Sequence, residues 1–398
     1  MKKVAFVVQR CGLEVNGGSE SLCLQVAQHM SRYWDTEILT TCALDNYMTW
    51  ENQYTPGIEE VEGTRIRRFT VDRPRIVDDF NRLSDTIRGR LSEASLAEQE
   101  EWMRAQGPMS SDLINFIRKH TDDYDAFIFF TYLYATTYFL LPLVQEKAFL
   151  VPAGHDEWPI YLSMWNAFFE MPKGFMFLTP EEKAFLQNRF PRANMEGPIS
   201  GIGIDMPRGG DPERFRRTYG IRAPFLLYMG RIDPSKGCDE LFRFFVDWRR
   251  MGGSPVKLLL LGKPAMPVPE HPDILALGYV DEQTKLDALA ACDWMVNPSP
   301  YESLSIVLLE AWSMGRPVLV TEKAQVLVGQ CRRANGGLWY MDWEEFVYIL
   351  NHSGKEKRSA LGEQGRHFVV ENYSWDEIID KYMALMQKTG LDSVSSTG

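Results

Sequence analysis

The sequence lacks an excess of basic residues and lacks any paired cysteine motif. Its 43 Lys and Arg residues are outnumbered by 54 Asp and Glu residues, which gives a formal net charge of −11 at pH 7. Because an acidic protein repels phosphate backbones, this balance disfavours general nucleic-acid binding. The cysteines form no Cys-x-x-Cys pair and have no histidine at metal-ligand spacing, so we expect buried thiols of a reducing compartment. They are Cys11, Cys23, Cys42, Cys238, Cys292 and Cys331.

The sequence also offers little that could target or anchor it. The apolar stretch at the N-terminus is interrupted by Gln9 and Arg10 and is too short for a signal peptide. Residues 126–144 run for 19 positions without a charge, which is long enough to cross a bilayer. Threonines, tyrosines and Pro142 dilute this run and few cations flank it. We therefore expect a buried strand at 126–131 and a buried helix from about residue 134.

Apolar residues are plentiful enough for large cores. They make up 45% of the chain, and aromatic residues 12%, which excludes a disordered or fibrous protein. The first half alternates strand and helix patterns, with a glycine-containing loop after the first strand. Residues 72–122 are more polar and have helical patterns, with Ser110 or Ser111 as the expected N-cap. Strands are expected at 4–10, 36–42, 126–131, 147–152, 174–178 and 198–202.

The second half repeats this alternation after a charged stretch at 204–224, which we interpret as an interdomain linker. Continuous apolar strands between helices indicate sheets covered on both faces. The sequence therefore predicts an α/β protein of two doubly wound, Rossmann-like domains, with the ligand in a cleft at the carboxyl ends of the strands. The expected strands are 225–230, 256–261, 293–297 and 317–321, and the expected helices are 238–251, 282–291 and 303–314.

Two cations follow the strand 225–230. Arg231 and Lys236 would lie at the carboxyl end of a parallel strand, beside a helix N-terminus. A guanidinium group can grip two oxygens, an ammonium group adds a point charge, and helix amides add their dipoles. These features predict an anion site, although an exposed loop that happens to hold two cations would look the same.

Two carboxylates lie eight residues apart around one apolar helix. Glu302 precedes the helix and Glu310 lies inside it, where a carboxylate is costly unless a group donates to it. The two hydroxyls of a ribose would suit, and eight residues span roughly 12 Å, about the distance from a ribose to a group on the second phosphate. The alternative is that Glu310 pairs with a core arginine such as Arg316.

Two weaker candidates follow strands of the first half. Gly17 and Gly18 precede a helix, where glycine lets the backbone approach a phosphate, although a simple turn explains them equally well. His155 follows the strand 147–152 in a loop with neighbouring carboxylates, so it serves either the site or the fold alone.

Two charged clusters are assigned no site. Asp123 and Asp125 have the spacing of a metal-bound sugar-nucleotide site but precede a strand, the wrong end for the cleft, so we reject them as metal ligands. A run of arginines is expected to pair with nearby acids, and binding of an anionic acceptor is the alternative. The arginines are Arg65, Arg67, Arg68, Arg73 and Arg75, and the acids are Glu59, Glu60, Glu62 and Asp72.

Together and in this order, these elements resemble a family-4 (GT4) retaining glycosyltransferase of the GT-B fold. The most specific match is Glu302 to Glu310 followed by the Ala-x-x-x-Gly-x-Pro-Val pattern at 311–318; EVNGGSE at 14–20 and GIGID at 201–205 also agree. The resemblance implies two facing Rossmann-like domains. They are an acceptor-side domain at 1–205, a nucleotide-sugar-binding domain at 206–373, and a C-terminal helix at 374–392 that crosses back to the first.

The resemblance also implies roles for the candidate residues. Arg231 and Lys236 would hold the donor diphosphate, Glu302 the sugar hydroxyls and Glu310 the ribose. One departure is that two glycines of the family are Ser303 and Ser305 here, which leaves the accepted sugar open. The implied catalytic residues are His155, Glu302, Arg231 and Lys236. The implied donor-binding residues are Gly17, Gly18, Arg231, Lys236, Val280, Ser303, Leu304, Ile306, Val307 and Glu310.

The implied reaction moves a hexose-type sugar from a UDP- or GDP-linked donor to a hydroxyl acceptor with retention. The acceptor would be a saccharide or a lipid-linked saccharide of surface polysaccharide or glycoconjugate synthesis, and neither metal nor other cofactor is expected. We expect a cytoplasmic protein, at most in transient contact with the inner membrane face, since its first half is acidic. A sugar-nucleotide epimerase of the GT-B fold and a non-catalytic relative are the alternatives.

Overall fold

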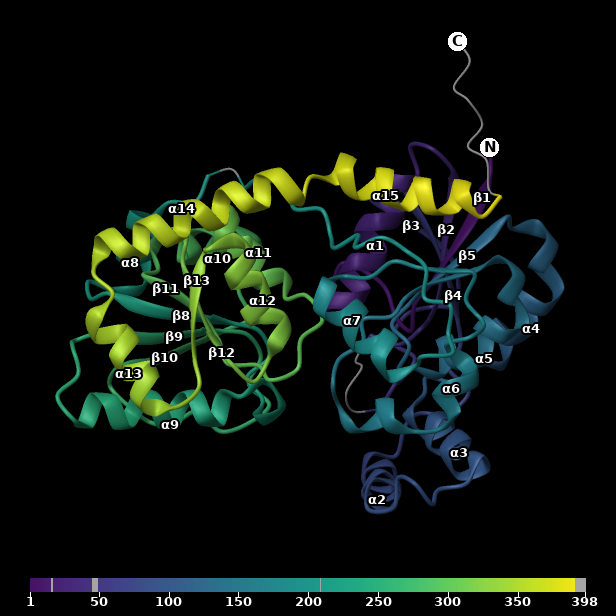
Figure 1. Ribbon diagram of the computed structural model, residues 1–398, viewed down its shortest axis with the longest axis horizontal. Helices are drawn as coiled ribbons and strands as arrows, with labels where there is room; N and C mark the ends of the chain where they lie inside the picture. Colours follow the sequence, from purple (N-terminus) through teal and green to yellow (C-terminus); the bar gives the residue numbers. More distant parts are fainter. Residues whose placement is uncertain (16, 45–48, 208, 391–398) are drawn as a thin grey trace, which may run out of the picture. The chain divides into compact units, whose positions relative to one another are not determined.

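The structure is a computed structural model that describes residues 1–15, 17–44, 49–207 and 209–390 (Figure 1). The chain divides into two compact units: unit 1 is Met1–Ile202 with Ile378–Gly398, and unit 2 is Gly203–Glu377. The expected boundary after residue 205 lies close to this division. The last helix, α15 (Trp375–Lys388), belongs to unit 1 from Ile378 onward. Residues 391 and 392 of the expected C-terminal segment lie outside the described residues.

Unit 1 is built on a seven-stranded sheet in the order β3-β4-β2-β1-β5-β6-β7. All neighbours run parallel except β3, which is antiparallel to β4. The interior strand β5 is buried along its whole length, as its unbroken apolar sequence AFIFF requires. The strands are β1 (Lys3–Val7), β2 (Asp35–Thr41), β3 (Gly57–Val61), β4 (Thr64–Phe69), β5 (Ala126–Phe130), β6 (Ala148–Val151) and β7 (Gly174–Phe175).

The helices of unit 1 begin where capping residues occur. The Ser110 hydroxyl accepts a hydrogen bond from the Leu113 amide, which confirms one of the two expected caps. Ser95 and Glu98 form a reciprocal capping box. The helices are α1 (Gly18–Met30), α2 (Val77–Arg88), α3 (Leu96–Gln106), α4 (Ser111–His120), α5 (Ala135–Leu140), α6 (Met164–Phe168) and α7 (Pro180–Arg189).

The arginine-rich segment of unit 1 is strand β4, which the sequence analysis did not predict. Arg65 and Arg67 pair with Asp35 and Glu37 of the neighbouring strand β2, and Arg68 pairs with Glu59 of β3. The expected pairing with acids is therefore right, but only Glu59 among the expected partners takes part in these three ion pairs.

Unit 2 has a six-stranded, fully parallel sheet in the order β10-β9-β8-β11-β12-β13. One core cluster joins apolar residues of α9 and α13 to one sheet face, and Figure 1 shows α10, α11 and α14 on the other. This is the doubly wound arrangement that the sequence predicted. The strands are β8 (Phe225–Met229), β9 (Lys257–Leu261), β10 (Ile274–Gly278), β11 (Trp294–Asn297), β12 (Val318–Thr321) and β13 (Gly337–Tyr340).

The expected linker at 204–224 contains a helix of unit 2 as well as connecting segments. Residues 212–219 form helix α8, which Asp211 caps and whose Phe215 is buried within unit 2. Arg208 of this stretch lies outside the described residues. The helices of unit 2 are α8 (Pro212–Tyr219), α9 (Cys238–Arg250), α10 (Glu282–Ala291), α11 (Ile306–Ser313), α12 (Gln325–Ala334), α13 (Trp343–His352) and α14 (Lys355–Asn372).

Three further expectations have clear outcomes. All six cysteines are buried and free of disulfides, as predicted. The uncharged run 126–144 folds as strand β5 and helix α5, and among the described helices none is both long and apolar enough to cross a membrane. The strand expected at 198–202 is wrong, because only an isolated bridge joins Ile199 to Phe177.

Candidate functional site

Strands β8 and β11 are neighbours in the sheet of unit 2, and the chain order reverses between them. The loops that leave their carboxyl ends therefore diverge to opposite sides, which opens a crevice in doubly wound sheets. Arg231 and Lys236 follow β8, and Glu302 follows β11. The predicted anion-binding cations thus occupy the point of the sheet at which such folds bind ligands.

Two neighbours fix Arg231. Its Nε lies 3.2 Å from Oδ2 of Asp233, and its side chain is 23% exposed. The buried Tyr228 hydroxyl donates to the Arg231 carbonyl oxygen at 2.6 Å, and burial raises the pKa of this hydroxyl above its ordinary value. Tyr228 was missed by the sequence analysis because its position within the apolar strand β8 resembles that of any core residue.

Lys236 and Glu302 form an ion pair, with Nζ 2.8 Å from Oε1. Their loops come together because Gly237, with φ of 73°, lies against the Pro298 carbonyl oxygen. A Cβ atom at this glycine would lie 2.3 Å from that oxygen, so only glycine permits the approach. The structure therefore brings together two residues that are 66 positions apart in the chain.

Helix α11 starts at Ile306, directly after the Glu302 loop. The amides of Ile306 and Val307 belong to its first turn, where backbone N–H groups have no acceptor within the helix. Ser305, at one of the two departures from the family pattern, has φ of 72° and accepts a hydrogen bond from Asn297 Nδ2 at 2.9 Å. The serine thus keeps the left-handed backbone that a glycine would adopt.

Glu310 is partnered by a residue that the sequence analysis did not consider. Lys285 of α10 places Nζ 2.8 Å from Oε1 of Glu310, whereas Arg316 donates to the Cys292 carbonyl oxygen. The expected core-arginine alternative is therefore wrong. Burial raises the pKa of the Glu310 carboxyl, and Lys285 offsets this rise only in part. No local sequence signal connects Lys285 to the site, since the contact joins two separate helices.

The remaining donor-side candidates lie in the same unit. Val280, half-buried, follows β10 and precedes the cap of α10, the helix that carries Lys285. Ser303 is half-buried and Leu304 is buried, both in the loop between Glu302 and α11.

Gly17 and Gly18 differ in their surroundings. Gly17 is the N-cap of α1 in an extended conformation, and a Cβ atom there would lie 2.2 Å from the Glu20 carboxylate. Glu20 forms a buried ion pair with Arg10, with Nε 2.7 Å from Oε1. No described atom lies within 4 Å of a Cβ position at Gly18. Gly17 thus has a packing role, whereas Gly18 has space beside it; Asn16 of the motif lies outside the described residues.

His155 lies in the loop after β6, with Nε2 3.2 Å from Oε1 of Glu157. Behind this loop is Glu182 of α7, which is buried and accepts hydrogen bonds from the amides of Gly154 at 2.7 Å and Leu178 at 2.6 Å. Burial raises the Glu182 pKa to about 7, against these hydrogen bonds and the nearby His155. The sequence analysis overlooked Glu182, because an acid in a first helical turn is ordinary.

The structure gives Asp125 of the rejected acidic pair a structural role. Asp125 accepts hydrogen bonds from the Lys3 amide and the Lys2 ammonium group. Within the described residues, no group of three or more His, Cys, Asp or Glu residues is placed to hold a metal ion.

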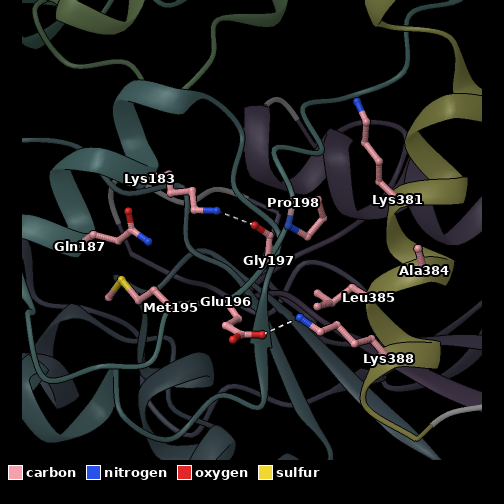
Figure 2. A pocket seen from close by; sticks show the side chains of 10 residues that line it. All are labelled: Lys183, Gln187, Met195, Glu196, Gly197, Pro198, Lys381, Ala384, Leu385 and Lys388. Atoms are coloured by element: carbon pink, nitrogen blue, oxygen red, sulfur yellow. Dashed lines mark hydrogen bonds and ion pairs between the residues drawn. The ribbon is translucent and has the colours of Figure 1, made fainter.

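Unit 1 also has a hollow of about 470 Å³ that contains none of the expected site residues (Figure 2). Figure 2 shows it between α7, α15 and the segment at 195–198. Lys183 donates to the Gly197 carbonyl oxygen at 2.7 Å, and Lys388 pairs with Glu196 at 2.8 Å. The second contact joins helix α15 to the rest of unit 1, and the first joins α7 to the segment at 195–198.

Comparison with known proteins shows which proteins the region around this site resembles. Residues 223–347 match the family model described as glycosyl transferases group 1. A D-inositol 3-phosphate glycosyltransferase of Rhodococcus erythropolis is 26% identical over 220 residues, which are 50% of this chain and 49% of the relative. The matched region thus spans about half the length of this curated relative.

Solved structures match nearly the whole chain. Sucrose-phosphate synthase from Thermosynechococcus elongatus has a TM-score of 0.72 at 16% identity, over 98% of this chain and 99% of that one. HepE from Anabaena, solved with UDP and glucose, has a TM-score of 0.68 at 13% identity, over 98% of this chain and 100% of that one. The chain is GT4-like and has the GT-B fold. The residues that match the family model include Arg231, Lys236, Val280, Glu302 and Glu310.

Proposed function

We propose that this GT4-like chain is a retaining glycosyltransferase that moves a hexose-type sugar from a nucleotide-diphosphate sugar to a hydroxyl of a saccharide or lipid-linked saccharide. The observation that carries the proposal is the presence of Arg231, Lys236 and Glu302 in the loops that follow the neighbouring strands β8 and β11, with Glu310 further along α11. The complex of HepE with UDP and glucose supports a donor of this kind.

The proposed chemistry depends on stabilising a leaving group. Arg231, Lys236 and the first amides of α11 offset the negative charge that grows on the departing diphosphate. The acceptor hydroxyl attacks the anomeric carbon from the face that the diphosphate leaves, and its proton passes to the leaving phosphate oxygen. The new bond therefore has the configuration of the old one. Protein cations supply the positive charge, so we propose that no metal is needed.

Glu302 and Glu310 take different parts in this proposal. Glu302 accepts hydrogen bonds from the sugar hydroxyls, and Lys236 turns from Glu302 toward the diphosphate when the donor binds. Glu310 accepts from the ribose. The role expected for His155, near the reacting carbon, stays a prediction.

The test is a screen of UDP- and GDP-sugars with saccharide acceptors, followed by kinetics of Lys236→Ala and Arg231→Ala. Each substitution is expected to lower turnover by about 10²- to 10³-fold with unchanged unfolding, because each removes a charge that acts on the leaving group. Lys257→Met is the matched control. Lys257 is the first residue of β9 and pairs with Asp273, so this substitution should leave turnover near the wild-type value.

Four outcomes would overturn parts of the proposal. An epimerised donor without transfer would identify an epimerase, and donor binding without turnover a non-catalytic protein. Loss of activity in EDTA that returns with Mg²⁺ or Mn²⁺ would contradict the metal-free mechanism. An inverted anomeric configuration in the product, read by NMR, would contradict retention.

A further inference from the structure

Lys285 connects helices α10 and α11 through two carboxylates. Its Nζ lies 2.8 Å from Oε1 of Glu310 and 2.8 Å from Oε2 of Glu282. Glu282 lies one turn earlier on the same helix and is 71% exposed, so water screens this contact. Lys285 and Glu310 are only 24% and 25% exposed. The contact between the two helices is therefore the shielded one.

The Glu310 carboxylate needs such a partner. Its side chain is largely shielded from water, and burial favours the protonated form of a carboxyl group. A protonated carboxyl has an O–H donor and fewer acceptor positions than a carboxylate. It therefore accepts hydrogen bonds from ligand hydroxyl groups less well. The Lys285 ammonium group opposes protonation of Glu310. Burial alone would lower the pKa of Lys285, but the Glu310 and Glu282 carboxylates raise it by more.

The ion pair uses only part of the carboxylate. Lys285 contacts Oε1, and within the described part of the chain no other cation pairs with Glu310. An ionised carboxylate has about four acceptor positions, which leaves Oε2 for other donors. The ammonium group and a pair of ligand hydroxyls can therefore share Glu310 without competing.

We infer that Lys285 is a positioning residue of the nucleotide site: its ammonium group holds Oε1 of Glu310 and leaves Oε2 to accept from the ribose hydroxyls. This inference rests on the function proposed above, which assigns the ribose to Glu310. It adds a residue of α10 to a site otherwise composed of loops after β8 and β11 and of helix α11.

The consequence is a pH dependence of nucleotide binding that becomes stronger when Lys285 is lost. The charged groups that face Glu310 in the described residues are Lys285 and Glu282. In Lys285→Met the remaining neighbour is the Glu282 carboxylate, which raises the pKa of Glu310 further. We expect the Kd of UDP or GDP, whichever the wild type binds, to rise about tenfold near pH 6.5 and to approach the wild-type value near pH 9. Lys285→Arg should restore most of the affinity, since it keeps the charge.

Calorimetry at both pH values measures this, with Glu282→Gln as the control that removes the exposed partner alone. Glu282→Gln is expected to bind nucleotide as the wild type does. Tighter binding by Lys285→Met would show that the lysine competes with the ribose, and an unchanged Kd at pH 6.5 would show that it does not matter; either overturns the inference.

A second measurement needs no ligand. In the nucleotide-free protein, Lys285→Met should lose more stability than the wild type as pH rises through the raised pKa of Glu310, and the double variant Lys285→Met/Glu310→Gln should not show this loss. Parallel profiles would overturn the inference. If the wild type binds no nucleotide diphosphate, the proposed function fails, and this unfolding comparison still decides whether Lys285 sets the charge of Glu310.

Discussion

At the scale of single residues, the candidate site is a set of opposite charges held together. Lys236 pairs with Glu302, and Lys285 pairs with Glu310. The sequence predicted three of these four residues, because each lies next to a strand end or inside an apolar helix where a charge is unexpected. Lys285 could not be predicted, since it lies on the polar side of an ordinary helix and only the packing of α10 near α11 brings it to Glu310.

Ser305 shows how the chain departs from its family pattern without losing the backbone. A non-glycine residue in the left-handed region costs roughly 1–2 kcal/mol. The Ser305 hydroxyl offsets part of this cost by accepting from the buried Asn297 side chain at 2.9 Å. The glycine-to-serine change at this position therefore adds a hydroxyl group and maintains the path of the loop.

The buried Glu182 carboxyl predicts a specific pH dependence of stability. Its pKa rises from 4.5 to about 7 on folding, chiefly through burial, while His155 and two backbone amides oppose the rise. The folded state thus binds an extra proton between these values. The contribution of Glu182 to the free energy of unfolding should be largest below pH 4.5 and should decrease as pH rises toward 7. Urea unfolding measures it: between pH 5 and pH 8 the wild type should lose roughly 2 kcal/mol more than Glu182→Gln.

The slope of stability against pH, compared between the wild type and Glu182→Gln, reports the titration of the Glu182 carboxyl. Glu182→Gln places an amide group against backbone donors, so it should be less stable than the wild type at every pH. Glu181→Gln, at the neighbouring position of the same helical turn, should keep the wild-type slope. Parallel profiles for the wild type and Glu182→Gln would contradict a carboxyl that titrates near neutrality.

At the scale of elements, apolar strands between helices were predictable and charged or short strands were not. Strand β5 is a continuous apolar run, and its expected bounds hold to one residue. Strand β4 alternates buried and half-buried residues, and arginines occupy half of its positions, so its strand pattern resembled a charged loop. The pairing of Arg65 and Arg67 with acids of β2 makes this strand possible. This pairing becomes visible only in the register between β2 and β4, which are neighbours in the sheet but far apart in the sequence.

Two glycines of α14 allow it to lie close to the helix that carries Glu310. A Cβ atom at Gly362 would lie 2.0 Å from the Gly315 carbonyl oxygen, and one at Gly365 would lie 2.2 Å from the Trp312 ring. Gly362→Ala should therefore destabilise the protein by about 1–3 kcal/mol, although alanine favours a helix by about 1 kcal/mol. Thermal unfolding measures the change.

Gly354→Ala is the matched control, because this N-cap residue of α14 has φ of −62° and no atom within 4 Å of a Cβ position. Its effect should stay within about 0.5 kcal/mol. A Gly362→Ala variant as stable as the wild type would show that α14 and α11 can separate without cost.

At the scale of the whole molecule, each unit has its own sheet, its own core and its own reversal of strand order. The reversal lies between β1 and β5 in unit 1 and between β8 and β11 in unit 2. Gly17 and Gly18 follow β1 at the first reversal, whereas His155 follows β6, one strand further along the sheet. The paired cations and acids gather at the second reversal. This asymmetry favours unit 2 as the part that binds the nucleotide.

Hydrogen exchange with and without nucleotide diphosphate tests this assignment directly. Ligand at 100 times its Kd stabilises the bound state by about 2.7 kcal/mol, so amides that open only when the ligand leaves should exchange up to about 100-fold more slowly. We expect the strongest protection at residues 236–238 and 306–309, because these first-turn amides lie beside Lys236 and the Glu302 loop. The same nucleotide concentration should leave Lys236→Ala largely unprotected. Protection confined to the strands of unit 1 would place the nucleotide in the other unit and would remove the basis for assigning the diphosphate to Arg231 and Lys236.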